Sequence, residues 1–152
     1  YTICDFDGND FEWIYKGYDR AVDYQFRAYD MNMVDSSEFP SGYNTYSGVA
    51  ANSVLINIWN WDPKWTLSVT ENGKELSWTQ IRDFDPLHIL GYTKVRGTGT
   101  TSAFLTKKTP HLFMVQASTA DATLEIKVTD RFGNVFKESM TRPRDFTIAH
   151  YK

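Results

Sequence analysis

The chain has 152 residues, of which 35 are Leu, Ile, Val or Phe, and this content excludes global disorder and suits one domain with its own core. Acidic residues outnumber basic ones by 19 to 16, and the resulting net charge of −3 argues against a nucleic-acid partner. A single cysteine, Cys4, excludes an internal disulfide, and no apolar run approaches the roughly 20 residues of a membrane-spanning helix.

The chain begins with an expected hairpin. Residues 1–6 and 11–16 are rich in apolar and aromatic side chains, and they flank the turn sequence Asp7-Gly8-Asn9. Aromatic and β-branched residues predict further strands downstream, because such side chains fit a half-buried pleated surface. In chain order these strands are expected at residues 24–29, 53–59 and 111–117.

The plainest hairpin signal lies in the middle of the chain. Residues 65–70 alternate between apolar and polar side chains, and Asn72-Gly73 is the strongest short cue for a two-residue turn. A shift by one residue would pair apolar with polar positions, so the sequence specifies the register. The expected register places Val69 opposite Leu76 and Leu67 opposite Trp78.

A last hairpin is expected near the end of the chain. Residues 123–129 alternate strictly, with Leu124, Ile126 and Val128 on one face. The following Asp130-Arg131-Phe132-Gly133 suits a type I turn closed by a glycine, and residues 134–136 then resume an extended chain.

Two stretches show no strand periodicity, residues 31–52 and 82–110, and both are expected to be long irregular loops. No amphipathic helix longer than a couple of turns is expected. About nine or ten short strands separated by turn signals predict an all-β fold, an antiparallel β-sandwich of the immunoglobulin or fibronectin kind that occupies residues 1–152 as one domain.

The side chains that could perform catalysis are few and scattered. Asp83 and Asp85 are spaced to share one strand face, an arrangement that could serve glycoside hydrolysis or metal binding, although solvated loop acids are the favoured interpretation. The three histidines, His88, His111 and His150, show no metal-ligand spacing, and a structural role is favoured for each. Gly97-Thr98-Gly99 lacks the strand, helix and lysine spacing of a phosphate-binding loop.

A tryptophan cluster is the most unusual feature of the sequence. Trp59, Trp61 and Trp65 lie within seven residues, together with Asp62 and Pro63. Trp65 heads an alternating apolar series and is expected in the core, whereas Trp61, near the turn, is the better candidate for exposure. Exposed tryptophans stack on sugar rings or pack against a partner surface, and packing is the favoured interpretation.

Several blocks in order give the chain a resemblance to a known family. They are Phe6-Asp7-Gly8-Asn9, the run from Val54 to Trp65, Asp85-Pro86-Leu87-His88, His111-Leu112-Phe113, the run from Val128 to Asn134, and Thr141-Arg142-Pro143. Together they resemble the C-terminal domain of bacterial calcineurin-like phosphoesterases. The resemblance implies a β-sandwich appended to a phosphoesterase domain, in proteins that are exported to the periplasm or cell surface.

The resemblance also implies where the metal chemistry lies. The catalytic domain of such enzymes holds two divalent metal ions with Asp, His and Asn side chains, in Asp-x-His, Gly-Asn-His and Gly-His-x-His motifs. Here Gly8-Asn9 is followed by Asp10, and Gly133-Asn134 is followed by Val135. No catalytic or metal-binding residue can therefore be assigned to this chain, and no cofactor is expected in it.

The sequence thus predicts a non-catalytic accessory domain that packs on an N-terminal catalytic phosphoesterase domain of the same chain and orients or stabilises it. The opening residues carry neither an initiator Met nor a secretory signal, so we expect a piece of a longer protein. The Trp-rich turn or a long loop would form the contact, and the candidate contact residues are Trp59, Trp61, Asp62, Trp65, Asp85, His88 and His111. The alternative is a carbohydrate- or surface-binding module that uses Trp61, and a third hypothesis is a small hydrolase that uses Asp83, Asp85 and His88 or His111.

Overall fold

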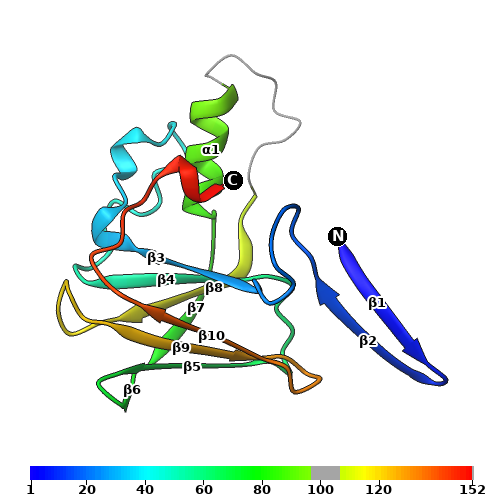
Figure 1. The fold of residues 1–152 in the computed structure, drawn as a ribbon. Coiled ribbons are helices and arrows are strands. Elements are labelled where there is room, and N and C mark those ends of the chain that lie inside the picture. Colours follow the sequence, from blue (N-terminus) through cyan, green and yellow to red (C-terminus); the bar gives the residue numbers. More distant parts are fainter. Residues whose placement is uncertain (97–106, 152) are drawn as a thin grey trace.

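The computed structural model describes residues 1–96 and 107–151, and strands dominate this part of the chain (Figure 1). Strands make up most of the described regular structure, so the prediction of an all-β fold is confirmed. None of the described helices is long and apolar enough to cross a membrane. The strands are β1 (Thr2–Asp7), β2 (Asp10–Tyr15), β3 (Phe26–Asp30), β4 (Ser53–Ile58), β5 (Thr66–Glu71), β6 (Lys74–Glu75), β7 (Trp78–Asp83), β8 (Thr109–Gln116), β9 (Leu124–Thr129) and β10 (Val135–Met140). The helices are α1 (Pro86–Arg96) and the short 3-10 turns η1 (Met31–Met33), η2 (Ser36–Glu38) and η4 (Ile148–Tyr151).

Two four-stranded antiparallel sheets form the predicted sandwich, with strand orders β10-β9-β5-β6 and β3-β4-β8-β7. Alternate side chains of each sheet point into the space between them, which is why the period-two segments of the sequence were readable as strands. The core between the sheets is made by Val54, Ile56, Phe113 and Val115 from one layer and Leu67, Val69, Ile126 and Val128 from the other.

The β3-β4-β8-β7 sheet is also covered on its outer face. Leu55 and Leu112 belong to a second apolar cluster, which includes Leu87, Ile89 and Leu90 of α1 and residues of the 31–52 segment. Figure 1 shows α1 and the 3-10 turns on this side of the sandwich. All six residues of β4 are buried for this reason, and a strand buried on both faces reads as a nearly continuous apolar run.

The turn predicted at Asn72-Gly73 forms as expected. Asn72 and Gly73 both have positive φ, 50° and 76°, as a primed two-residue turn requires, and Leu76 N donates to Val69 O at 2.8 Å. The predicted pairing of Leu67 with Trp78 is wrong, because β6 ends at Glu75 and the chain crosses to the other sheet. Trp78 pairs instead with Val115 of β8, while its indole Nε1 still donates to Leu67 O at 3.0 Å.

The helix α1 contradicts the prediction that residues 82–110 form a loop without a helix of more than two turns. Leu87, Ile89 and Leu90 are buried against the sheet, and Asp85 caps the first turn, because its Oδ1 accepts from His88 N at 2.7 Å. Pro86 occupies the first helical position, which its fixed φ suits. The glycine-rich part of the expected loop, residues 97–102, lies outside the described residues.

The hairpin β1–β2 forms a third, separate sheet that projects from the sandwich (Figure 1). Among the described strands, β1 and β2 pair only with each other, and all six residues of β1 are exposed. Trp13 in β2 makes an edge-to-face contact with Phe132 of the β9–β10 turn, with ring centroids 4.7 Å apart. The guanidinium of Arg131 lies 5.0 Å from the Trp13 ring centroid.

Candidate functional site

A cleft of about 720 Å³ lies where the base of the β1–β2 hairpin meets one end of the β3-β4-β8-β7 sheet. The end of β4, the beginning of β8 and the first turn of α1 contribute to its wall. Four of the seven candidate residues named from the sequence line it, although they come from three separate parts of the chain. They are Trp59, Asp85, His88 and His111.

Asp85 is fully engaged by the fold. Besides capping α1, its carboxylate accepts from the Tyr29 hydroxyl at 2.7 Å and from Asn57 Nδ2 at 2.6 Å. Burial and the adjacent Asp85 carboxylate raise the pKa of Tyr29 well above its ordinary value, so the hydroxyl stays protonated as the donor. Asp85 therefore ties the beginning of α1 to β3 and β4.

The expectation that Asp83 and Asp85 share a strand face is wrong. Asp83 ends β7, whereas Asp85 lies beyond it, where the chain turns into α1. The Asp83 carboxylate lies 3.2 Å from Lys108 Nζ and also accepts from Phe84 N. Within residues 1–96 and 107–151, no three or more His, Cys, Asp and Glu side chains are grouped so that they could hold a metal ion.

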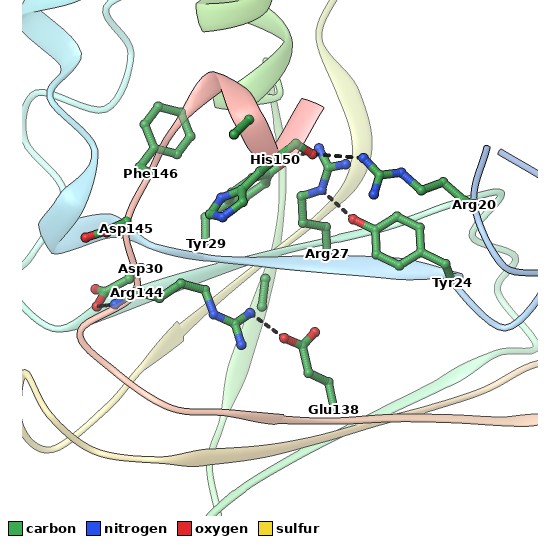
Figure 2. Close-up of a pocket in the computed structure, with 12 residues that line it drawn as sticks. Arg20, Tyr24, Arg27, Tyr29, Asp30, Glu138, Arg144, Asp145, Phe146 and His150 are labelled. Atoms are coloured by element: carbon green, nitrogen blue, oxygen red, sulfur yellow. Dashed lines mark hydrogen bonds and ion pairs between the residues drawn. The ribbon is translucent and has the colours of Figure 1, made fainter. Parts of the chain in front are cut away.

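Cations and aromatic rings form one side of the cleft. Arg27 Nε donates to the Tyr24 hydroxyl at 2.6 Å, and the Arg27 guanidinium lies 5.6 Å from the ring centroids of both Tyr24 and Trp59. Arg20 lies 5.3 Å from the Tyr24 ring and donates to His150 O at 3.2 Å. Arg20, Tyr24 and Arg27 also line a neighbouring cavity of about 300 Å³. Figure 2 shows the three residues in the wall of that smaller cavity.

Sequence reasoning did not single out this group. One available signal was Arg27 itself, because an arginine between Phe26 and Ala28 in a strand that is otherwise buried must have a specific environment. Arg20 lies in a connection without periodicity and Tyr24 begins the strand expected at residues 24–29, so only the fold brings both residues beside Arg27.

The aromatic rings of the cleft form a corner and not a flat row. Trp59 is tilted by 47° against both Tyr15 and Tyr24, at centroid distances of 6.3 and 6.0 Å. Carbohydrate-binding surfaces of the kind expected from the sequence would need coplanar rings. The described part of the cleft does not offer such a row.

The pKa of His111 is shifted by its place in the cleft. Its imidazole is about half-buried, and burial lowers its pKa below the ordinary value of 6.5. A neutral imidazole is therefore favoured near neutral pH. His150, the third histidine, lines the smaller cavity and not the cleft.

The other three candidates, Trp61, Asp62 and Trp65, stabilise a turn of the sandwich. Trp65 is buried as predicted, whereas Trp61, expected to be exposed, is half-buried against Phe113 with ring centroids 4.5 Å apart. The carboxylate of Asp62 pairs with Arg131 at 3.0 Å and accepts from Lys64 N. The Trp-rich turn is thus not an open binding surface.

Comparison with known protein families matches residues 1–136 to the family described as the C terminal of calcineurin-like phosphoesterase. The chain belongs to this family. The match includes the β1–β2 hairpin and all residues of the cleft, and the sequence-based recognition is confirmed. As a C-terminal domain of calcineurin-like phosphoesterases, the chain is not the catalytic domain of such enzymes. No significant match was found among curated proteins or among solved structures.

Proposed function

We propose that this domain is a non-catalytic accessory module that packs on the catalytic domain of its own phosphoesterase through the β1–β2 hairpin, and orients or stabilises that domain. The proposal takes residues 1–152 as one domain. It also takes the two divalent metal ions and the hydrolytic chemistry to belong to the catalytic domain, in a protein exported to the periplasm or cell surface.

The observation that carries the proposal is the exposure of the hairpin. An isolated two-stranded hairpin is marginally stable in water and needs packing against another element. Here β2 is the one described strand that pairs with β1, and the phenylalanine ring of Phe6 at the tip is 71% exposed. A hairpin with large apolar side chains in water is the sort of surface that a partner covers.

The two faces of the hairpin differ in chemistry. The strand register places Phe6 opposite Phe11 and Cys4 opposite Trp13, so one face is aromatic. Phe6 and Phe11 stack with ring centroids 4.7 Å apart. Four acidic residues lie on the other face, namely Asp5, Asp7, Asp10 and Glu12. The aromatic face is the one that favours burial in an interface core, from which charged side chains are depleted.

The catalytic domain is the occupant that the family membership favours. A C-terminal domain follows its catalytic domain in one chain, so the catalytic domain is present wherever the hairpin is. Covering the aromatic rings would also remove apolar surface from water, at about 25 cal/mol per Å².

The test is a pair of double variants in the complete phosphoesterase. Replacing Phe6 and Phe11 by serine should lower the thermal unfolding midpoint of the catalytic domain by about 4 °C or more, because two rings lose their burial. Amide hydrogen exchange of β1 and β2, slow in the unaltered protein, should become fast.

The matched control replaces Asp5 and Glu12 by serine. These residues also face each other across the two strands, on the opposite side of the hairpin. The control should neither lower the unfolding midpoint of the catalytic domain nor accelerate amide exchange in β1 and β2. Equal behaviour of the two double variants, with hairpin amides already unprotected in the unaltered protein, would refute docking through the aromatic face.

A further inference from the structure

Arg27 has an unusual charge environment for a partly buried arginine. Three other arginines of the sandwich each pair with a carboxylate: Arg131 with Asp62, Arg142 with Asp30 and Arg144 with Glu138. Among the described residues, Arg27 contacts only neutral groups, the Tyr24 and Tyr29 hydroxyls and the rings of Tyr24 and Trp59. Buried charges in proteins are ordinarily paired, so the guanidinium has unused capacity for an anion.

The wall of the cleft carries a surplus of positive charge. Arg20, Arg27 and Lys107 line it, together with the imidazoles of His88 and His111, and Asp85 supplies the one carboxylate among the described lining residues. The chain as a whole is acidic, with a net charge of −3, so this surplus is a local feature. The Asp85 carboxylate already accepts three hydrogen bonds, which leaves it little capacity to neutralise the cations.

Tyr24 adds a hydrogen-bond donor beside the guanidinium. Its hydroxyl oxygen accepts from Arg27 Nε at 2.6 Å, so the hydroxyl proton is directed away from Arg27. No described residue accepts that proton. A guanidinium and a phenol at this distance can together donate to one tetrahedral anion.

We propose that the cleft binds a phosphate monoester, with Arg27 and Tyr24 donating to the phosphate and the rings of Trp59 and Tyr15 contacting the organic group. A phosphate group offers several acceptor oxygens at once, so it can accept from the Arg27 guanidinium and from the Tyr24 hydroxyl together. The volume of about 720 Å³ accommodates more than a bare phosphate, and two aromatic rings favour a planar or ring-shaped substituent. The site does not depend on how the hairpin docks.

The test is calorimetric titration of the 152-residue chain with phenyl phosphate at low ionic strength. Saturable binding is expected, and Arg27→Gln should weaken it about tenfold or more, because a charge-assisted pair of hydrogen bonds is lost. The matched control is Arg82→Gln, which removes the same charge from an exposed position on β7 outside the cleft. It should change the affinity by less than about twofold.

Further measurements keep the outcome decisive. Tyr24→Phe retains the ring and removes the hydroxyl donor, so it should weaken binding about threefold or more without altering the circular dichroism spectrum. Binding should also raise the pKa of the His111 imidazole in an NMR titration, because an anion nearby favours the imidazolium. Absence of saturable binding, equal affinities for Arg27→Gln and Arg82→Gln, or equal affinities for benzoate and phenyl phosphate would overturn the proposal.

Discussion

The hairpins β1–β2 and β9–β10 have the same construction, with six residues in each strand and a glycine at positive φ in each turn. Their burial is very different. Leu124, Ile126 and Val128 in β9 are buried against the opposite sheet, whereas every residue of β1 is exposed. Local sequence is therefore sufficient for a hairpin in both places. Whether the apolar face is covered depends on the rest of the molecule, and in β1–β2 the described contacts reach Trp13, through Phe132, but leave Phe6 71% exposed.

Substituting one isoleucine in each hairpin should give the largest difference in the free energy of unfolding between the two hairpins. Ile126→Ala should destabilise the 152-residue chain by about 4 kcal/mol, because the side chain is 1% exposed and its removal leaves a cavity between the sheets. Ile3→Ala, at a residue that is 41% exposed, should change the free energy of unfolding by less than about 0.5 kcal/mol. Urea denaturation followed by circular dichroism measures both. Similar losses in the two variants would mean that the hairpins are equally integrated in the fold.

The segment that follows β10 provides a second contrast. Arg142 pairs with Asp30 at the end of β3 at 2.9 Å, and both side chains are fully buried. Asp30→Asn leaves the Arg142 charge buried without its partner, and it should cost about 3 kcal/mol in urea denaturation. The control is Glu138→Gln, which breaks a partly exposed pair with Arg144 and should cost less than about 1 kcal/mol. A cost for Asp30→Asn no larger than that of the control would show that this anchor is not needed.

The two turn glycines give a smaller and more selective effect. Gly8 and Gly133 have φ of 61° and 89°, and an added Cβ would meet no atom within 4 Å at either position, so only the backbone conformation matters. Gly133→Ala should lower the global stability by about 1 kcal/mol. Gly8→Ala should leave the global stability unchanged and accelerate amide exchange in β1 and β2 alone. Equal effects on global unfolding would argue that β1–β2 unfolds together with the sandwich.

The same contrast explains how much of the fold was predictable. Strands with one solvent-exposed face, such as β5 and β9, alternate strictly between apolar and polar side chains, so the sequence predicts both the strands and their turns. The helix α1 was missed because Gly91, Thr93 and Val95 are poor helix formers, and its stability comes from the Asp85 cap and from buried Leu87 and Leu90. The departure of the chain from the β5–β6 ladder before Trp78 depends on tertiary packing and has no local signal.

The candidate site was predictable only in part for a related reason. Trp59, Asp85, His88 and His111 were named individually from the sequence, but their meeting in one cleft depends on the pairing of β4 with β8 and on the start of α1. Of the cationic part, Arg20 lies between the hairpin and β3, and Arg27 lies within β3. Trp61 and Asp62 were expected to form a contact surface, but they stabilise their own turn because the fold encloses it.

The smallest expected effect concerns the pH dependence of stability. Burial lowers the pKa of His111 below 6.5 in the folded chain, so the unfolded chain binds the proton more readily. Stability is therefore fully retained above pH 6.5 and should decline as the pH falls from there toward the folded pKa of His111, then level off for this group. His111→Gln should reduce that slope between pH 7.5 and 5.5 in urea denaturation without phosphate. Because β1–β2 contains no histidine, the difference between the two proteins should appear in global unfolding of the sandwich, and an unchanged slope would contradict the burial of His111.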